Sequence, residues 1–502
     1  MSYDNTKAIS VLEYALETSD FGDMEIKAAA DLMLFSPDDW EEIKSKFPKE
    51  FIKKASDVMK KIKLEYVKST TEMGIADSFL NQNRGNVRFC GDFEHGWMIF
   101  DNRQWTEDQT EMIKSKIRDH IKKIGNGDAK LEKSSVLNSI EKLVKIEQKI
   151  RTVASDWDKH DFLLGVPGGV IDLKTGLMTE SHKELLISKR ASCAPKKDHN
   201  CLKWGKFLDD ITDGDGDYKK YLQKLMGYFL TGSTAEQAIF FGFGAGGNGK
   251  SVWANIINFL LSDYCGTAPF STFAMNANDN HPTDLAGFVG KRCIVASETK
   301  ENRTWNADLI KSISGQDKIA ARFMHGNFFE YFPNFKLMVI GNHMPNLQSV
   351  DHAARRRFHI LPFLFDPVKN KSSVNQNLIE ELKGELPAIM QWAIDGCILW
   401  QKEGLEKPKK VKELTDSYFE AEDIFADFLR EVQEERQIPD NNKVNSSWLF
   451  ALYTEFLEKN GELPSTNKRM AQQLKKLGYK KEVTNKGAFF FWKAIETQKN
   501  DN

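Results

Sequence analysis

A glycine-rich stretch that ends in lysine and serine has the residue types and spacing for phosphate chemistry. Residues 244–251 read GAGGNGKS, which fits the pattern G-x-x-x-x-G-K-[ST] of a phosphate-binding loop. In such a loop backbone N–H groups converge on phosphate oxygens, the lysine reaches the β- and γ-phosphates, and the serine hydroxyl ligates Mg²⁺. The residues expected around the phosphates are Gly244, Gly246, Gly247, Asn248, Gly249, Lys250, Ser251 and Val252. The stretch therefore predicts a nucleoside triphosphate site that uses Mg²⁺.

The segments on either side of this loop are those that a phosphate site needs. An apolar run at 238–243 predicts a buried strand, and apolar residues at helical spacing in 252–261 predict a helix. The helix would begin at the loop and add the partial positive charge of its N-terminus. A tight strand–helix turn without a ligand is the plainer alternative.

Two further apolar runs end in polar side chains suited to hydrolysis. The strand predicted at 293–298 ends in Glu298, whose carboxylate could orient the attacking water and support Mg²⁺. The strand predicted at 335–341 is followed by Asn342, an amide that could hold the γ-phosphate or the water without adding negative charge. The alternatives are a glutamate that caps the next turn and an asparagine that forms one.

Basic residues follow these strands in two places. Arg355, Arg356 and Arg357 precede a third predicted strand at 358–363. In ring ATPases an arginine so placed projects into the neighbouring subunit's nucleotide and raises the rate ~10³–10⁵-fold, whereas a solvated basic turn is the alternative. The segment 311–332 predicts a helix and then a hairpin, and basic and apolar residues near its tip could grip a DNA backbone.

Composition excludes several classes of protein. The chain has 502 residues, a length typical of roughly two to four domains, and a formal net charge of −2, so it is not globally basic. No stretch approaches the ~18 apolar residues of a membrane-spanning helix, and the first residues lack the apolar core of a signal peptide. Scattered cysteines without a C-x-x-C pair predict reduced thiols rather than a zinc ribbon. These features favour a cytoplasmic protein without a membrane partner.

The first half of the chain predicts two regions. Residues 1–70 read as amphipathic helices, either a plain packed bundle or one that binds a partner or forms oligomers. Residues 71–219 predict a mixed α/β region with strands near 84–106 and a long helical stretch from 107 to 155. An acidic loop at 209–217 is interpreted as helix-capping carboxylates rather than as a calcium loop.

The second half predicts two more regions, 220–404 around the phosphate loop and 405–502. The last region predicts helices followed by a two-stranded ribbon, which suggests a winged helix. Its end is rich in basic residues, namely Lys468, Arg469, Lys475, Lys476, Lys480, Lys481, Lys486 and Lys493. A helix over 465–474 could contact duplex DNA, and the alternatives are a solvated basic face or a subunit-docking domain.

The order of the motifs resembles that of a superfamily 3 helicase. It runs G-x-x-G-N-G-K-S, K-R-x-x-V-A-S-E, K-S-I-S-G-Q-D-x-I-x-A-R, F-K-L-x-x-x-G-N-H and D-x-A-x-R-R-R-F. The chain is most similar to the phage, plasmid and poxvirus-type primase-helicases, strongly over about residues 160–400 and more weakly over about 70–160 and the C-terminal region. Residues 71–219 resemble the region upstream of the helicase in those proteins, which could form an oligomerisation collar. This resemblance implies an AAA+ ring, a homohexamer, that uses ATP and Mg²⁺ and moves 3′ to 5′ along single-stranded DNA.

The same resemblance implies roles for single residues. It assigns Lys250 and Ser251 to the triphosphate and Mg²⁺, Glu298 to Walker B, Asn342 to sensor 1, and Lys318, Arg322 and His325 to the hairpin that tracks DNA. It makes Arg356 or Arg357 the arginine finger, because Arg355 stands where relatives often have tryptophan. The chain departs from many relatives in having Ser297 before Glu298, where they have a second acid. It also lacks the zinc-ligand cysteines and acidic cluster of an upstream primase, so primer synthesis is not predicted.

Together these features predict an α/β protein with an AAA+ P-loop ATPase core, a mainly helical N-terminal region and a C-terminal winged-helix-like domain. The expected function is an ATP-dependent replicative helicase of a phage, plasmid or mobile genetic element, in a bacterial cytoplasm. Its expected partners are single-stranded and forked DNA and other copies of the chain, with origin DNA and replication proteins as further candidates. The alternatives are a replication initiator that mainly binds and melts an origin, and a P-loop NTPase that does not act on nucleic acid.

Overall fold

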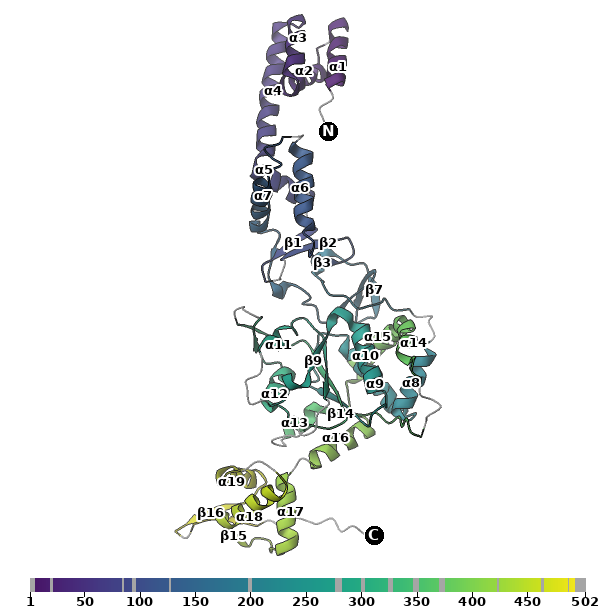
Figure 1. Ribbon diagram of the computed structural model, residues 1–502, viewed down its shortest axis with the longest axis vertical. Helices are drawn as coiled ribbons and strands as arrows, with labels where there is room; N and C mark the ends of the chain where they lie inside the picture. The colour runs from purple at the N-terminus through teal and green to yellow at the C-terminus, as the bar shows by residue number, and fades with distance from the viewer. Residues whose placement is uncertain are drawn as a thin grey trace. The chain divides into compact units, whose positions relative to one another are not determined.

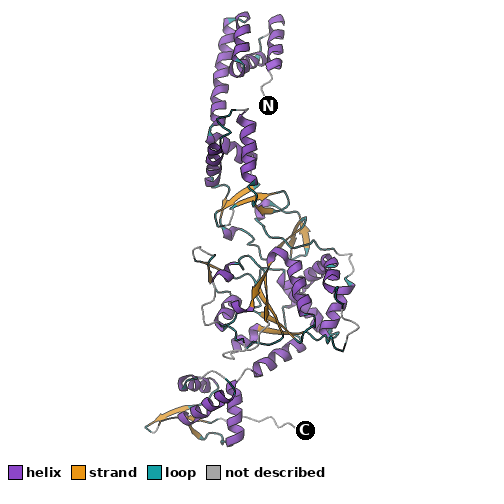
Figure 2. Cartoon of the chain, in the orientation of Figure 1, coloured by secondary structure: helices purple, strands orange, loops and turns teal. Residues whose placement is uncertain are grey.

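The structure is a computed structural model of a mixed α/β chain (Figures 1 and 2). It describes residues 5–18, 21–83, 85–92, 96–125, 128–196, 201–275, 282–298, 303–323, 328–345, 352–369, 375–421, 424–461, 465–485 and 487–492. Contacts divide the chain into two compact units, Met1–Ala194 and Pro195–Asn502. Within the described ranges, no helix is both long and apolar enough to cross a membrane. The six cysteines are free thiols.

The first unit begins with a helical bundle. Its helices are α1 (Asn5–Thr18), α2 (Asp23–Phe35), α3 (Pro37–Ile43) and α4 (Lys49–Thr70). Apolar residues at amphipathic spacing, such as Leu12, Leu32 and Phe51, lie buried between these helices. The bundle therefore has a hydrophobic core of its own.

The rest of the first unit combines helices with two small sheets. Its elements are α5 (Glu72–Gln82), β1 (Val87–Cys90), β2 (Trp97–Phe100), β3 (Trp105–Glu107), α6 (Met112–Gly125), α7 (Ser134–Ile146), β4 (Arg151–Thr152), β5 (Leu163–Val166), β6 (Gly169–Asp172) and β7 (Leu177–Thr179). The sheets have the orders β3-β2-β1-β4 and β5-β6-β7. Aromatic residues of the first sheet, including Trp97 and Trp105, are buried, as expected of hairpin core.

The single helical stretch expected over 107–155 is wrong. Two helices, α6 and α7, occupy it, and the strand β4 begins at Arg151. The helix ends at Gly125, a weak helix former, and Asp128 then starts a turn by accepting a hydrogen bond from the Lys130 backbone N–H at 2.9 Å. The sequence does carry a signal for this break, because the run GNGD at 125–128 is typical of a turn.

The second unit is built on a five-stranded sheet of order β14-β8-β13-β10-β9 in which every neighbouring pair is parallel. The strands are β8 (Ile239–Phe243), β9 (Cys265–Pro269), β10 (Cys293–Glu298), β13 (Lys336–Gly341) and β14 (Phe358–Pro362). A parallel sheet covered on both faces is apolar along its whole strands, and β13 is buried at all six residues. Helices lie on both sides of this sheet (Figure 1).

The remaining elements of this part surround the sheet. They are α8 (Leu202–Thr212), α9 (Gly216–Phe229), α10 (Lys250–Leu261), α11 (Pro282–Ala286), α12 (Ala307–Gly315), β11 (Ile319–Ala321), β12 (Phe329–Tyr331), α13 (His352–Arg357), α14 (Leu378–Gly384) and α15 (Leu386–Glu403). The acidic loop between α8 and α9 caps a helix as expected, because the Asp215 carboxylate accepts a hydrogen bond from the Tyr218 N–H at 3.0 Å.

The C-terminal residues form a small group of elements with their own core. These are α17 (Ile424–Arg436), β15 (Lys443–Asn445), α18 (Ser446–Lys459), α19 (Asn467–Lys476), β16 (Lys481–Thr484) and β17 (Gly487–Phe491). Helix α16 (Lys409–Ala421) precedes them and packs on the parallel sheet instead, since its Tyr418 and Phe419 lie in the core of that sheet. The strands pair in the order β15-β17-β16, and Leu449, Leu474 and Phe490 are among the buried residues beneath them. Three helices and a three-stranded sheet therefore share one apolar cluster.

Helices α9 and α15 cross at glycines, and this contact yields a prediction. A Cβ added at Gly396 would lie 2.1 Å from the carbonyl oxygen of Gln223. We expect Gly396→Ala to lower the thermal midpoint of unfolding, because overpacking costs roughly 1–3 kcal/mol. The matched control is Gly205→Ala on α8, where an added Cβ meets no atom within 4 Å and alanine favours the helix. Circular dichroism melts check both, and an unchanged midpoint for Gly396→Ala would contradict the crossing.

Candidate functional site

The glycine-rich loop joins β8 to α10, as the sequence predicts. Gly249 has a φ of 96°, and a Cβ there would lie 2.9 Å from the Ile211 side chain. A Cβ at Gly244 would lie 2.0 Å from the side-chain nitrogen of Asn248. Both positions therefore need glycine, for backbone conformation and for space. Gly246 has no such neighbour within 4 Å, so the loop stays open there.

The ammonium group of Lys250 lies inside the loop. It donates to the carbonyl oxygens of Gly244 at 2.7 Å and Ala245 at 2.8 Å, and to the side-chain oxygen of Asn248 at 2.8 Å. Burial lowers the pKa of Lys250. Because uncharged oxygens compensate a buried ammonium poorly, a phosphate oxygen would be a stronger acceptor for it.

Asn248 has a role that spacing alone does not signal. Its side chain is 1% exposed, and while its oxygen accepts from Lys250, its nitrogen donates to the Phe363 carbonyl oxygen at 3.0 Å. Phe363 directly follows β14. The Asn248 amide thus ties the loop to the end of a neighbouring strand and orients the lysine.

Helix α8 supports the loop from below, a feature that the sequence analysis missed. Phe207 and Ile211 lie under Gly249, and Trp204 stacks on Trp253 of α10 with ring centroids 5.7 Å apart. The N-terminus of α8 is held by the Glu385 carboxylate, which accepts from the Trp204 N–H at 2.9 Å. Apolar residues at helical spacing in 202–212 carry the signal. Helix α8 lies before the domain boundary predicted at 220, yet it packs on the loop.

The strand register brings Glu298 and Asn342 to the same edge of the sheet as the loop. Gly341 pairs with Phe243 on one side and with Glu298 on the other, so these three backbones form one row. At ~4.8 Å per strand, the Glu298 backbone lies about 10 Å from that of Phe243. Asn342 directly follows this row and is exposed. Ser251 is exposed and Val252 half-buried in the first turn of α10, beside the loop.

Arg355, Arg356 and Arg357 lie at the opposite edge of the sheet. Helix α13 ends at Arg357, and the next residue, Phe358, pairs with Ile239 at the start of β8. The loop follows the other end of β8, and a five-residue strand spans about 13 Å. The arginines of one chain are therefore separated from its own loop by the length of the sheet.

The surroundings of the three arginines differ. Arg355 is bound within the chain, since its Nε lies 3.1 Å from the Asp416 carboxylate. Arg356 is exposed and donates to the Gln237 side-chain oxygen at 3.3 Å. Arg357 is half-buried and lines a small cavity with Trp305 and Lys311. Of the three, Arg356 is the most accessible to solvent.

Lys407 holds the end of the helix that carries these arginines. Its Nζ donates to the carbonyl oxygens of Arg355 at 3.3 Å and Arg356 at 3.4 Å. Burial lowers the pKa of Lys407 to about 8. The cation also interacts favourably with the partial negative charge at the C-terminus of α13.

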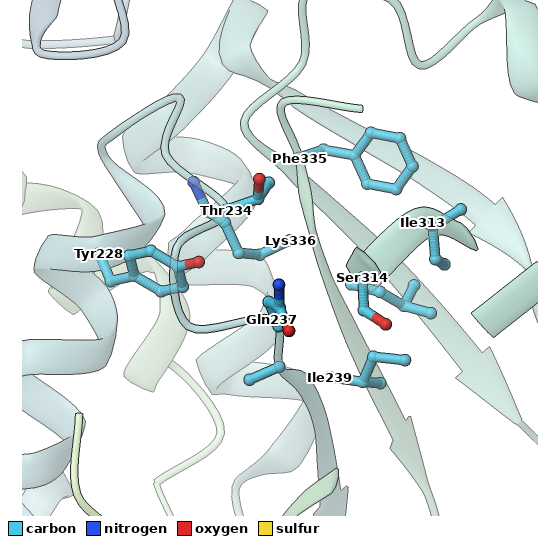
Figure 3. Close-up of a pocket in the computed structure, with 10 residues that line it drawn as sticks. Tyr228, Thr234, Gln237, Ile239, Ile313, Ser314, Phe335 and Lys336 are labelled. Atoms are coloured by element: carbon cyan, nitrogen blue, oxygen red, sulfur yellow. The ribbon is translucent and has the colours of Figure 1, made fainter. Parts of the chain in front are cut away.

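A small cavity at the amino ends of β8 and β13 does not suit a nucleotide (Figure 3). Tyr228, Gln237, Ser314 and Lys336 line it, and its volume of about 10 Å³ corresponds to roughly one water molecule. The buried Lys336 donates to the Thr231 carbonyl, and its Nζ lies 4.8 Å from the centre of the Tyr228 ring. This lysine thus satisfies a backbone carbonyl after α9, which is a structural role.

The predicted hairpin is present as the antiparallel pair β11 and β12. Lys318 lies next to it, 3.9 Å from the Glu330 carboxylate, and the Arg322 guanidinium lies 4.9 Å from the Phe328 ring centre. His325 lies outside the described residues. Three phenylalanines that the sequence pattern did not single out are exposed here, namely Phe323, Phe328 and Phe332, at 53%, 62% and 58%. Exposed aromatic rings beside cations are surfaces on which bases can stack.

Comparisons with known proteins bear on this site. Residues 75–213 match the family model described as D5 N terminal like, and residues 243–357 match a family of unknown function, DUF5906. The relatives are viral. Over 295 residues the chain is 25% identical to "Putative helicase L207/L206" of Acanthamoeba polyphaga mimivirus, covering 54% of this chain and 30% of that protein. It is 26% identical over 255 residues to "Putative helicase 022R" of Frog virus 3, covering 47% of this chain and 26% of that protein.

The chain thus spans less than a third of the length of these curated relatives. A solved structure, the apo C-terminal region of NrS-1, aligns with 83% of this chain and 97% of its own at 10% identity and a TM-score of 0.48. The sequence comparisons support the resemblance to helicases of the phage and viral type. The segment matched by the second family model runs from Phe243 to Arg357, from the start of the loop to the arginines. The superfamily 3 assignment stays a prediction.

Removal of the Asn248 amide tests its place in the loop. In Asn248→Ala the Phe363 carbonyl loses its donor and Lys250 loses an acceptor, at a cost of roughly 1–3 kcal/mol for a buried group left unpaired. We expect a lower thermal midpoint and at least ~10-fold weaker binding of a fluorescent ATP analogue. Asn81→Ala, at an exposed position on α5 outside the site, is the control and should keep both near wild type. Equal binding by both variants would contradict the role of Asn248.

Lys407 predicts a pH dependence of stability. Its folded-state pKa of about 8 lies below the ordinary value of 10.5, so between these pH values the unfolded chain binds more protons. Its contribution to the free energy of unfolding therefore rises from pH 8 to pH 10.5 and is smallest below pH 8. Urea unfolding of wild type and Lys407→Met at pH 7.5 and 9.5 measures this, because other groups titrate equally in both. Identical pH slopes would show that Lys407 titrates normally.

Proposed function

We propose that this chain is the motor part of an ATP-dependent replicative DNA helicase of a phage, plasmid or other mobile element. The observation that carries the proposal is the division of the site between two edges of one sheet. The glycine loop, Asn342 and the Glu298 backbone lie at the carboxyl ends of the strands, where open α/β sheets bind ligands. The arginines lie at the amino ends. The similarity to viral helicases supports the same conclusion.

Each group at the carboxyl edge has a task in phosphoryl transfer. Lys250 would exchange the loop oxygens it now contacts for the β- and γ-phosphate oxygens of ATP. The Ser251 hydroxyl, exposed in the first turn of α10, and Glu298 would hold Mg²⁺, which neutralises charge on the phosphates. Glu298 would also orient the attacking water, and Asn342 would contact the γ-phosphate as sensor 1.

The arginines support a site shared between subunits. A chain whose own arginines lie across the sheet can complete the charge stabilisation only with a second copy, which suits a superfamily 3 AAA+ ring, proposed as a homohexamer. We assign the finger to Arg356, which is exposed, with Arg357 beside it. The hairpin β11–β12, with Lys318, Arg322 and His325, would contact single-stranded DNA within the ring and move it 3′ to 5′ as ATP is hydrolysed.

Mixing two inactive variants tests this arrangement. Lys250→Ala should lose ATP hydrolysis and unwinding of forked DNA, and Arg356→Ala should lose hydrolysis by ~10³-fold or more while still assembling. In mixed complexes an intact loop of Arg356→Ala meets an intact arginine of Lys250→Ala, so part of the hydrolysis should return. Phosphate release in the presence of single-stranded DNA measures ATP hydrolysis, and sedimentation measures assembly.

The controls separate this shared site from a site within one chain. Arg430→Ala removes an exposed arginine paired with Asp427 and should behave as wild type. Full activity of Arg356→Ala, or no recovery on mixing, would contradict the shared site, and normal strand separation by Lys250→Ala would overturn the mechanism.

Because the C-terminal segment is basic, an origin-binding initiator is the second candidate. Much tighter binding of its own origin than of random duplex at fixed salt would favour it. ATP hydrolysis unaffected by single-stranded DNA would favour an NTPase that does not act on nucleic acid.

A further inference from the structure

The C-terminal elements enclose a groove that no part of the nucleotide site uses. It lies among α18, α19, β16 and β17, has a volume of about 420 Å³, and is lined by Ser446, Ser447, Asn467, Lys468, Ala471, Lys475, Lys481 and Ala488. Three of these eight described lining residues are lysines and none is acidic. The remainder are neutral polar residues and alanines, so the lining carries a net positive charge.

Helix α19 places two of the lysines on one face. Lys468 and Lys475 lie seven residues apart, two turns of the helix, with Ala471 between them. Met470 and Leu474 point the other way, and both are fully buried in the apolar cluster of this part. The helix is therefore fixed by its apolar face while the lysines stay exposed.

The third lysine comes from the ribbon. Lys481 begins β16, and its Nζ lies 5.7 Å from the centre of the Phe490 ring on β17. The acid next to it in sequence, Glu482, lies 2.8 Å from Lys443 instead. That ion pair leaves Glu482 partly neutralised and out of the groove lining, so the groove keeps its positive charge although the whole chain carries −2.

Neutral donors complete the lining. The Ser446 hydroxyl donates to the Asn467 side-chain oxygen at 3.0 Å, which joins the first residue of α18 to the first residue of α19. Two helix N-termini, each with partial positive charge, therefore meet at the groove. The Ser447 hydroxyl and the Asn467 amide lie beside the lysines as hydrogen-bond donors.

We propose that this groove binds the phosphate backbone of duplex DNA. Lysine, serine and asparagine side chains together with helix N-termini are the groups that hold proteins to DNA phosphates. The exposed helix α19 beside the antiparallel strands β16 and β17 also has a shape that the major groove of DNA, about 12 Å wide, admits. The proposal is independent of the nucleotide site, and it gives the chain a grip on duplex DNA apart from any strand inside a ring.

The test uses the full chain and a fluorescent blunt-ended duplex of random sequence, without nucleotide. Affinity is measured by anisotropy at several salt concentrations. The variant Lys468→Ala/Lys475→Ala/Lys481→Ala should bind at least ~10-fold more weakly, and its plot of log affinity against log salt should be shallower by about 2–3, near 0.9 per lost phosphate contact. Circular dichroism confirms that the variant is folded.

A matched variant removes the same charge elsewhere. Lys60, Lys409 and Lys459 lie 3.2, 3.7 and 3.0 Å from carboxylates, outside the groove, so their triple alanine variant should keep duplex affinity within about 3-fold. Unchanged duplex affinity and salt slope in the groove variant would overturn the proposal. Loss of self-association with duplex binding intact would overturn it too and assign the groove to protein docking. Hydrolysis of ATP is not part of this readout, so failure of the nucleotide site leaves the result interpretable.

Discussion

Parallel register is the constraint on which the rest of this structure depends. Because β8, β13 and β10 run side by side in the same direction, Phe243, Gly341 and Glu298 share one row although they are far apart in sequence. The polar residues that follow such strands must then meet at one edge. The same rule sends the residues that precede β14, the arginines of α13, to the other edge. The glycine-rich loop, Glu298 and Asn342 are thus separated from the arginines of α13 by the length of the strands.

The loop itself is held by contacts that reach beyond it. Asn248 joins Lys250 to the carbonyl after β14, and α8 fills the space under Gly249 with Phe207 and Ile211. Hydrogen bonds that are buried and fully satisfied fix a single geometry, because any rearrangement leaves a group unpaired. The backbone of the glycine-rich loop is therefore held in one geometry by side chains that lie behind it.

The sequence was sufficient where one local pattern determines both an element and its end. The apolar runs before Gly244, Glu298 and Asn342 predicted strands that are present, because buried parallel strands are continuous apolar segments. It was insufficient where the reason lies in tertiary contacts. The side chain of Asn248 faces inward because the end of β14 lies there, and α8 belongs beside the loop because its aromatic residues pack on α10. The turn at Asp128 was missed although the local run GNGD at 125–128 is typical of a turn, because the helical pattern on either side was extended across it.

Net charge says little about what this chain can bind. A formal charge of −2 over 502 residues averages surfaces that are far apart compared with a Debye length of ~8 Å in physiological salt. What matters locally is whether each cation is already paired. Lys443 and Lys459 lie against carboxylates, whereas the groove beside α19 is lined by lysines without acidic neighbours in its lining. The adjacent residues Arg355 and Arg356 show the same contrast, since Arg355 is paired with Asp416 whereas Arg356 is exposed. The positions of the acidic side chains therefore determine where an anionic partner can bind, because they pair with some cations and leave others exposed.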